Sequence, residues 1–284
     1  TADFALRTPQ YVVEDVAELL GIEVEPLDDD STPLAIQGIN NNGEMVGYHY
    51  REDWYGSPTG YRMTGWYYDG IAGHWLTDAD PNAQTCGDGI SDNGWITGNI
   101  FWPDNWDLSV RGFIIKPDGS RTLLEHLGSV REDNGAWPEE INDSGTVVGE
   151  FMKSNWNDYP VVWENGQIRT LLCPSDGGSA YDINRAGLIA GSAGIQAVIW
   201  TATDRITLPD ALAPAYVNYG VSANCLNNNG LAVGAQNFYR EGGYWFRYAE
   251  PLVWENGSVS ILPIMDAPEI DSPLGRALGV NDNN

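Results

Sequence analysis

Aromatic side chains stand beside acids, amides and arginines in several separate segments of the chain. An aromatic ring stacks on the C–H face of a sugar, and planar carboxylate, amide and guanidinium groups bind the hydroxyls, so this combination is typical of carbohydrate recognition. Two other interpretations stay open, because aromatic rings also pack long loops onto a scaffold and form protein interfaces. The residues that we expect to contact a ligand are Tyr50, Trp54, Trp102, Trp106, Trp137, Trp156, Tyr159, Tyr239 and Trp245.

Titratable groups in the same segments could catalyse a reaction instead. Two carboxylates held roughly 5–10 Å apart can hydrolyse a glycosidic bond as acid and base. A polysaccharide lyase needs a base beside a cation that neutralises a uronate, which His49, Tyr50 and Arg51 could supply. The candidate catalytic residues are Glu52, Asp53, Asp104, Glu132, Asp133, His49 and Arg51. With 40 acids in the chain, neighbouring acids also arise by chance on a solvated surface, so catalysis stays an alternative.

Oxygen ligands for a hard cation alternate along one short segment. Asp78, Asp80 and Asn82 could bind calcium, which is the only cofactor that the sequence suggests. The segment lacks the glycine and terminal glutamate of a complete calcium-binding loop, so an ordinary acidic turn is the alternative. Three cysteines, Cys86, Cys173 and Cys225, are expected to be small buried hydrophobic residues.

The charge of the chain excludes several classes of partner. Its 284 residues include 40 acids and 14 bases, which gives a formal net charge of −26. Phosphate binding requires clustered cations, so a nucleic-acid partner and docking on an anionic membrane are not expected. No apolar run reaches the roughly 18–20 residues of a membrane span, so we expect no membrane insertion.

The elements that must position these residues come from a repeat. Each copy has an aliphatic residue, usually Asn, two polar residues, Gly, then two or three mostly apolar residues and a second Gly. Successive copies start 51, 51, 42, 43 and 54 residues apart, a period typical of propeller-type repeats. The copies are Ile39–Gly47, Ile90–Gly98, Ile141–Gly149, Ile183–Gly191, Leu226–Gly234 and a sixth that begins at Val280.

One copy predicts a β-hairpin, because Asn and Asp tolerate turn conformations and Gly supplies a positive φ. Most copies are followed by a second hairpin of the form aliphatic-aliphatic-Trp-x-x-Gly, as in Val161–Gly166. Each repeat therefore gives four strands, A to D, which make one propeller blade. We expect Trp163, Trp200 and Trp254 of the second hairpin to pack between blades rather than to contact a ligand.

The alternation of these two hairpins resembles the extracellular HAF repeats of bacterial proteins, from about Tyr11 to Asn284. The letters that give that family its name are not literally present, since the corresponding places read Gly112-Phe113 or Pro160-Val161. The resemblance implies a β-propeller that is secreted or displayed on a surface. It identifies no catalytic residue.

We therefore expect an all-β fold, a β-propeller of four-stranded blades with five complete blades plus split elements of a sixth, in a single domain over residues 1–284. The short A–B and C–D turns should lie on one face, and the longer B–C and D–A loops with the expected ligand residues on the other. The expected repeat cores lie near 34–76, 84–124, 136–172, 179–208 and 219–263, with end strands near 11–20 and 275–281.

The two end strands leave the sixth blade without its strands B and C. The chain could be a fragment of a six-bladed protein, a five-bladed ring with extra end strands, or a subunit completed by a neighbouring chain through strand addition. Our hypothesis is a secreted binding module for carbohydrate or another cell-surface ligand. The alternatives are a carbohydrate-active enzyme on the same face and a structural protein that self-assembles through the open blade.

Overall fold

The computed structural model describes residues 16–22, 34–52, 61–102, 110–125, 127, 133–153, 157–211, 216–240, 247–263 and 275–282. Over these residues the chain forms twenty strands in five antiparallel sheets of four strands each. The strands are β1 (Leu34–Ile39), β2 (Met45–Glu52), β3 (Tyr61–Tyr68), β4 (Gly73–Leu76), β5 (Gln84–Ile90), β6 (Ile96–Phe101), β7 (Arg111–Ile115), β8 (Arg121–Leu123), β9 (Asp133–Ile141), β10 (Val147–Lys153), β11 (Asp158–Glu164), β12 (Gln167–Thr170), β13 (Gly178–Ile183), β14 (Ile189–Ala193), β15 (Gln196–Trp200), β16 (Arg205–Thr207), β17 (Tyr216–Leu226), β18 (Ala232–Arg240), β19 (Arg247–Glu255) and β20 (Ser258–Ile261).

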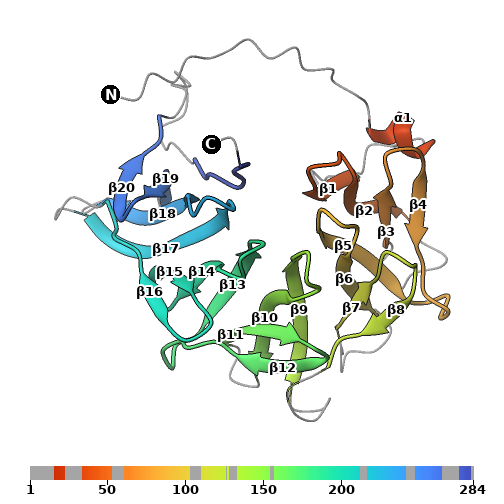
Figure 1. Ribbon diagram of the computed structural model, residues 1–284, viewed down its shortest axis with the longest axis horizontal. Coiled ribbons are helices and arrows are strands. Elements are labelled where there is room, and N and C mark those ends of the chain that lie inside the picture. The colour runs from red at the N-terminus through yellow and green to blue at the C-terminus, as the bar shows by residue number, and fades with distance from the viewer. Residues whose placement is uncertain are drawn as a thin grey trace.

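Each sheet uses four consecutive strands, so the five sheets are blades one to five in chain order. The blades stand side by side around a common centre, with the first strand of each blade contacting the first strand of the next (Figure 1). This arrangement is a β-propeller, which confirms the expected fold class. Blades three and five begin at Asp133 and Tyr216, slightly before the repeat cores expected from 136 and 219.

The first glycine of each repeat closes the A–B turn. These glycines have φ between +76° and +85°, a conformation that other residues reach only with strain. The asparagine that starts the turn caps it, as Asn184 does by accepting the Leu188 N–H at 3.0 Å. The glycines are Gly43, Gly94, Gly145, Gly187 and Gly230.

The second glycine of each repeat is required for a different reason. Strand A carries a register shift in every blade, which is a β-bulge, two or three residues before its end. The shift brings a strand A carbonyl over the facing glycine of strand B, so a Cβ on Gly149 would overlap the Trp137 oxygen and one on Gly191 the Ser179 oxygen. The repeat therefore encodes both a turn and a close backbone approach.

Apolar side chains pack between neighbouring blades. Val46 and Leu76 of blade one lie in one cluster with Ile90 and Ile96 of blade two, and similar clusters join the later blades. The second-hairpin tryptophans are part of this packing, as expected. They are 1–3% exposed, and their indole N–H groups donate to carbonyls of the preceding D–A connection: Trp163 to Glu125, Trp200 to Leu172 and Trp254 to Pro209.

The two ends of the chain differ from the sequence-based expectation. The expected N-terminal strand near 11–20 is wrong over its second half, because Val16–Leu20 forms the helix α1, whose Leu20 lies against Gly73 of β4. Residues 11–15 lie outside the described residues. Residues 275–282 lie along blade five, where Gly275 and Ala277 donate backbone hydrogen bonds to Ala249 and Gly234, but they form no assigned strand.

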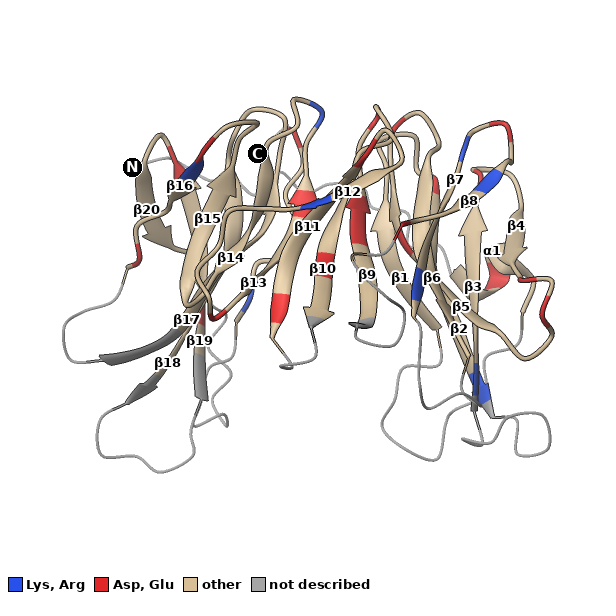
Figure 2. Ribbon diagram, turned by 90° about the horizontal axis from the view of Figure 1, so that it is seen from below, with Lys and Arg blue, Asp and Glu red and all other residues tan. Residues whose placement is uncertain are grey.

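The side view shows the A–B and C–D turns along one edge of the described blades, with both acidic and basic residues along it (Figure 2). Among the described residues, no helix has the length and apolar character needed to cross a membrane.

Candidate functional site

Most of the expected ligand-binding and catalytic side chains lie outside the described residues. The roles that we expect for these residues therefore stay predictions. They are Trp54, Trp106, Trp156, Trp245, Asp53, Asp104 and Glu132, together with the side chains of Glu52, Asp133 and Tyr239, whose backbones lie in strands. The described members are His49, Arg51, Tyr50, Trp102, Trp137 and Tyr159.

Blade one carries a cavity of ≈ 530 Å³, which we call the blade-1 pocket. Its walls come from β2, β3, β4, the first residues of β5, the connection from β4 to β5 and Ile22, which lies two residues past α1. The pocket is lined by Ile22, His49, Arg51, Arg62, Thr64, Trp75, Thr77, Asp78, Asp80, Pro81, Ala83 and Thr85. Two of the expected site residues, His49 and Arg51, therefore lie in it together with two of the expected calcium ligands.

Strand pairing explains why these side chains share one surface. Arg51 lies directly opposite Arg62, and His49 lies directly opposite Thr64, across β2 and β3. Directly opposed residues of an antiparallel pair project to the same face. Val46 and Leu76 project to the other face, which packs against blade two.

The same alternation corrects the expected cluster of His49, Tyr50 and Arg51. Tyr50 follows the alternation of Val46 and projects to the face opposite that of its two neighbours. His74, a further histidine of this blade, stacks on Tyr67 with ring centroids 4.6 Å apart and contacts Asp69 at 2.8 Å. A base made of adjacent His and Tyr side chains is therefore not assembled.

One wall of the pocket is aromatic. The Trp75 side chain is 45% exposed, and the His49 ring lies with its centroid 6.0 Å from the Trp75 ring at an angle of 41°. Burial, and secondarily the charge of Arg51, lowers the pKa of His49 below its usual value. His49 is therefore neutral near pH 7 and can both donate and accept a hydrogen bond.

The opposite wall is polar. The Arg62 guanidinium donates to the Pro81 carbonyl at 2.7 Å, which fixes it against the β4–β5 connection. Arg121 lies 3.4 Å from an Asp78 oxygen and donates to the Thr77 carbonyl at 3.0 Å. The pocket thus offers fixed guanidinium, imidazole and hydroxyl groups beside one aromatic ring.

The expected calcium segment forms two consecutive turns. Asp78 accepts the Asp80 N–H at 3.0 Å, and Asp80 accepts the Asn82 N–H at 2.9 Å. The second oxygen of Asp80 accepts the Trp102 indole N–H at 3.1 Å, and Arg121 faces Asp78. Neighbouring donors therefore satisfy these carboxylates, and within the described part of the chain no cluster of three His, Cys, Asp or Glu residues is placed to hold a metal ion.

Three other expected ligand aromatics have packing roles. Trp102 lies against the blade-two core and bonds to Asp80. The Trp137 ring lies against Gly135, and the Tyr159 hydroxyl donates to the Ser175 carbonyl at 3.1 Å. Each of these three side chains is only partly exposed. Their contacts agree with the alternative interpretation from the sequence, in which aromatic rings pack loops onto the scaffold.

A second cavity, of ≈ 550 Å³, lies at the centre of the ring beneath the A–B turns, and we call it the central cavity. The turn asparagines link blade to blade around it. The side-chain amide of each donates to the backbone carbonyl of the corresponding residue one blade later: Asn40 to Ser91 at 2.9 Å, Asn142 to Asn184 at 3.3 Å, Asn184 to Asn227 at 3.1 Å and Asn227 to Asn281 at 2.9 Å. We call this series the asparagine ladder. Blade two has Ser91 at this place, and its hydroxyl bonds within its own turn.

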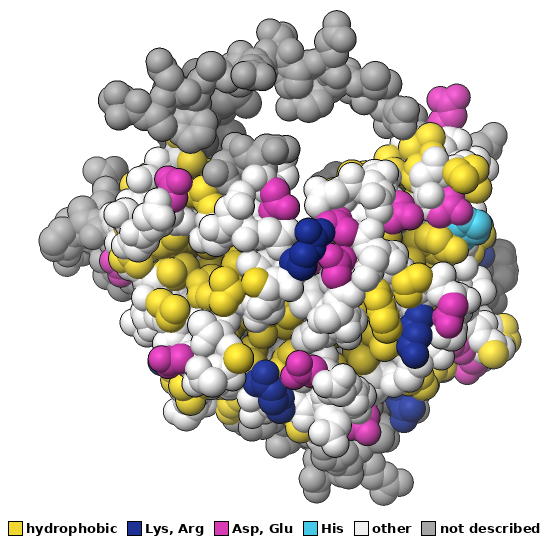
Figure 3. All heavy atoms as spheres, viewed as in Figure 1, with side chains coloured by type: hydrophobic (Ala, Val, Ile, Leu, Met, Phe, Trp, Pro, Cys, Tyr) yellow, Lys and Arg dark blue, Asp and Glu magenta, His cyan; other side chains and the backbone are white. Residues whose placement is uncertain are grey.

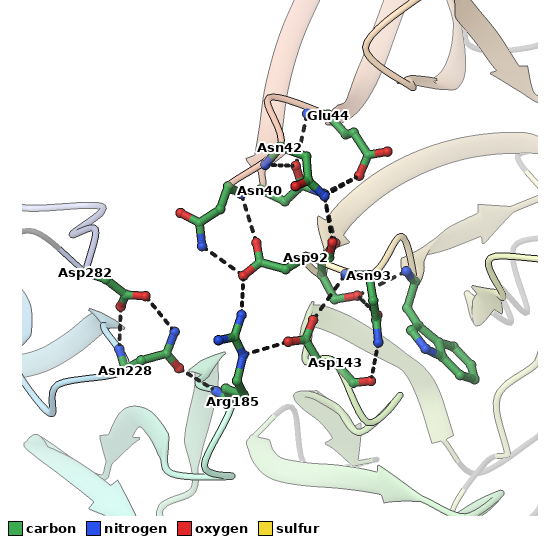
Figure 4. A network of polar contacts seen from close by, with 12 residues as sticks. Asn40, Asn42, Glu44, Asp92, Asn93, Asp143, Arg185, Asn228 and Asp282 are labelled. Atoms are coloured by element: carbon green, nitrogen blue, oxygen red, sulfur yellow. Dashed lines mark hydrogen bonds and ion pairs between the residues drawn. The ribbon is translucent and has the colours of Figure 1, made fainter.

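The following turn residue adds a second set of links (Figure 4). Asn41 donates through its backbone and side chain to Asp92, and Asn228 donates in the same way to Asp282. Arg185 reaches across three blades, with Nε 2.7 Å from Asp143 and Nη2 2.6 Å from Asp92. A basic side chain amid acidic ones marks the middle of this face in the space-filling view (Figure 3).

Partly buried carboxylates lie on the inner strands near the central cavity. Burial raises the pKa of Asp88 to about 7 and, with the nearby charges of Asp88 and Glu150, raises that of Glu139 to about 8. Burial also raises the pKa values of Glu140, Glu150 and Asp182. Asp88 accepts hydrogen bonds from the Cys86 thiol at 2.8 Å and from Asn99 at 2.6 Å, so Cys86 is a buried donor, close to the expected role.

Sequence reasoning missed Arg62, Thr64 and Trp75 of the blade-1 pocket. Their signal was the alternation of β2, β3 and β4, which becomes visible only when the register of the strand pairs is known. It also missed the partly buried acids, whose signal was their place just before the aliphatic residue of the repeats in blades two to four, as in Asp88-Gly89-Ile90.

Known proteins resemble the chain in structure only. No protein-family model and no curated protein matches it. A streptogramin B lyase is similar over 86% of this chain and 87% of its own, at 12% identity and a TM-score of 0.45. A lectin from Aleuria aurantia, described as a six-bladed β-propeller with fucose recognition, is similar over 84% and 80%, at 14% identity and a TM-score of 0.45. The β-propeller domain of the Trilobed protease from Pyrococcus furiosus is similar over 82% and 83%, at 11% identity and a TM-score of 0.43.

Proposed function

We propose that this β-propeller is a binding module that holds a carbohydrate in the blade-1 pocket. The observation that carries the proposal is the half-exposed Trp75 ring in a cavity with His49, Arg51, Arg62 and Thr64. A sugar stacked on the indole would present its hydroxyls to these planar and hydroxyl groups. The proposal includes an extracellular location, on the strength of the resemblance to HAF repeats.

The groups that line the pocket favour binding of a ligand over catalysis. The two carboxylates that line the pocket, Asp78 and Asp80, are held by Arg121 and the Trp102 indole, as described above. Because these carboxylates already have partners, they are suited to a structural role in the pocket wall rather than to proton transfer. The pocket groups otherwise are cationic or neutral, which suits recognition of a ligand.

The Trp75→Ala variant tests the pocket. We expect it to weaken sugar binding by about tenfold or more, because the ring provides the stacking surface. Ile261→Ala is the matched control, since Ile261 is 47% exposed and lies opposite Leu252 in blade five as Trp75 lies opposite Trp66 in blade one. A glycan array identifies ligands, and titration calorimetry then gives the affinities of both variants.

Trp106→Ala and Trp156→Ala complete the experiment. If they abolish glycan binding while Trp75→Ala leaves it intact, the ligand binds at the B–C loops instead of the blade-1 pocket. If the wild-type protein retains no glycan, the carbohydrate proposal is wrong and the assembly alternative gains weight.

A further inference from the structure

We propose that Asn165 and Asn256, at the tips of the C–D hairpins of blades three and five, are sites of spontaneous deamidation. The A–B turns protect their own asparagines from the same reaction. This inference is independent of the carbohydrate proposal. It follows from the six Asn-Gly pairs of the chain and from the hydrogen bonds of the five pairs whose side chains the structure describes.

Deamidation of an Asn-Gly pair requires no enzyme and no reactant other than water. The backbone nitrogen of the glycine bonds to the side-chain carbonyl carbon of the asparagine and loses its proton, and ammonia leaves as a five-membered succinimide ring closes. Water then breaks one of the two C–N bonds of the ring that flank its nitrogen, which gives aspartate or, where the backbone bond breaks, isoaspartate. Glycine permits the attack because it has no Cβ to obstruct the approach.

The A–B turns hold both reacting groups of their Asn-Gly pairs. The glycine N–H donates to the carbonyl of the first turn residue: Gly43 to Asn40 at 3.1 Å, Gly94 to Ser91 at 3.1 Å and Gly230 to Asn227 at 3.2 Å. The asparagine amide donates to a backbone carbonyl of the next repeat (Figure 4): Asn42 to Asp92 at 2.7 Å, Asn93 to Asp143 at 2.8 Å and Asn229 to Asp282 at 2.7 Å. Closure of the succinimide ring would break both hydrogen bonds.

The C–D hairpins of blades three and five hold neither group. Asn165-Gly166 and Asn256-Gly257 are exposed two-residue turns with φ between +52° and +78°. Within the described part of the chain, the asparagine amides and the glycine N–H groups of these two turns have no hydrogen-bond partner. The asparagines of the A–B turns are exposed as well, so access of water does not distinguish the two kinds of turn. Hydrogen bonding does.

The ring of blades tolerates the reaction at these two tips. Each event replaces a neutral amide with a carboxylate, and isoaspartate also lengthens the main chain between the paired residues Glu164 and Gln167 by one carbon atom. The two hairpin tips contribute none of the blade-to-blade links described above. At an A–B turn, by contrast, the new carboxylate would face the carbonyl oxygen of the next repeat and break a link.

The test follows each pair by peptide mapping and mass spectrometry after incubation of the folded protein in mildly alkaline water labelled with heavy oxygen. The label marks carboxylates that form during the incubation. We expect Asn165 and Asn256 to react about ten- to hundredfold faster than Asn42, Asn93 and Asn229, because two hydrogen bonds must break in the A–B turns. In urea, where the turns are unfolded, the five pairs should react at similar rates.

Two variants separate hydrogen bonding from position. Asp118→Asn creates an Asn-Gly pair in the C–D turn of blade two, where the Gly119 N–H donates to Lys116 at 2.8 Å and the Asp118 side chain accepts the Ser120 N–H at 2.9 Å. The new pair should react as slowly as those of the A–B turns. Asn165→Gln should remove one of the two increments of negative charge that isoelectric focusing detects in the wild-type protein.

Three results would overturn the proposal. Equal rates at all five pairs of the folded protein would show that the hydrogen bonds give no protection. A difference that persists in urea would assign it to the neighbouring sequence. Fast reaction of the pair created by Asp118→Asn would show that position at a C–D turn decides the rate.

Discussion

At the scale of single residues, the repeat concentrates chemistry in strand A. The acids Asp88, Glu139, Glu140 and Asp182 stand at the bulge of this strand in blades two to four, where blades one and five carry Gln37, Gly38, Asn224 and Cys225. A bulge leaves one residue unpaired and changes the direction of its side chain. The inner strands can therefore hold partly buried carboxylates whose pKa values are raised by loss of water.

These raised pKa values make the folding stability depend on pH. Glu139 keeps its proton up to about pH 8 in the folded protein, whereas the unfolded chain releases it near pH 4.3. Between these values the folded state binds more protons, so its stability is full below the lower pKa and falls as pH rises toward the higher one, by at most about 1.4 kcal/mol per pH unit.

Glu139→Gln tests this dependence. Gln cannot ionise, so we expect the loss of stability between pH 5 and pH 8 to become smaller in this variant, as measured by urea unfolding at several pH values. Glu164→Gln removes the same charge from an exposed hairpin and should keep the wild-type slope. An unchanged slope in Glu139→Gln means that this carboxylate is already ionised in the folded protein.

At the scale of elements, the blade-to-blade links are as regular as the sequence repeat. The asparagine ladder is interrupted at blade two, where Ser91 is too short to reach the Asn142 carbonyl and bonds instead to Asn93 and Trp95. Because one link is missing at blade two, restoring it by mutation measures how much a single link contributes to the free energy of unfolding.

Ser91→Asn should restore the missing link and stabilise the protein by about 0.5–1.5 kcal/mol, the usual net contribution of one hydrogen bond. Asn184→Ser should have the opposite effect, because it removes the donor to the Asn227 carbonyl. Urea midpoints of the two variants check both signs. Destabilisation by Ser91→Asn together with a neutral Asn184→Ser would contradict a stabilising role of the ladder.

The sequence predicted the blades well because turn chemistry and apolar alternation are local signals. Asn165 and Asn256 precede Gly166 and Gly257, and all four have positive φ, as the second hairpin required. The pocket was less predictable, because the pairing of Arg51 with Arg62 depends on the register between β2 and β3. The length of the connection between these two strands does not determine that register. The helix Val16–Leu20 was missed because its apolar residues fit a strand as well as a single helical turn.

At the scale of the whole molecule, residues 275–282 extend the ring past blade five. Their Asn281 and Asp282 occupy the places that Asn227 and Asn228 hold in the preceding repeat, so the ladder continues to the end of the described chain. The hydrogen bonds from Asn228 also lower the pKa of Asp282 below its usual value. This segment therefore stabilises the inner edge of blade five above pH 4 and less at more acidic pH.

Asp282→Ala tests this role. The variant leaves the backbone and side-chain amides of Asn228 without their acceptor, so we expect faster hydrogen exchange at Asn228 and in the adjoining end of β17. Asp210→Ala, which removes an exposed acid elsewhere, serves as the control. Equal exchange rates in β17 for the two variants would show that the Asp282 contacts contribute nothing to this edge.

The asparagine ladder also has a direction, since every donor lies in one blade and its acceptor in the next. Blades joined in this way are equivalent to the monomers of a head-to-tail polymer, in which each monomer has a hydrogen-bond donor on one side and an acceptor on the other. Except at the junction after blade two, where Ser91 makes no link, a unit of this kind can be duplicated, deleted or exchanged as a whole without changing the chemistry of its junctions. A consensus blade inserted between blades three and four should therefore find both a donor, Asn142, and an acceptor, the Asn184 carbonyl, which makes this propeller a modular scaffold for protein engineering.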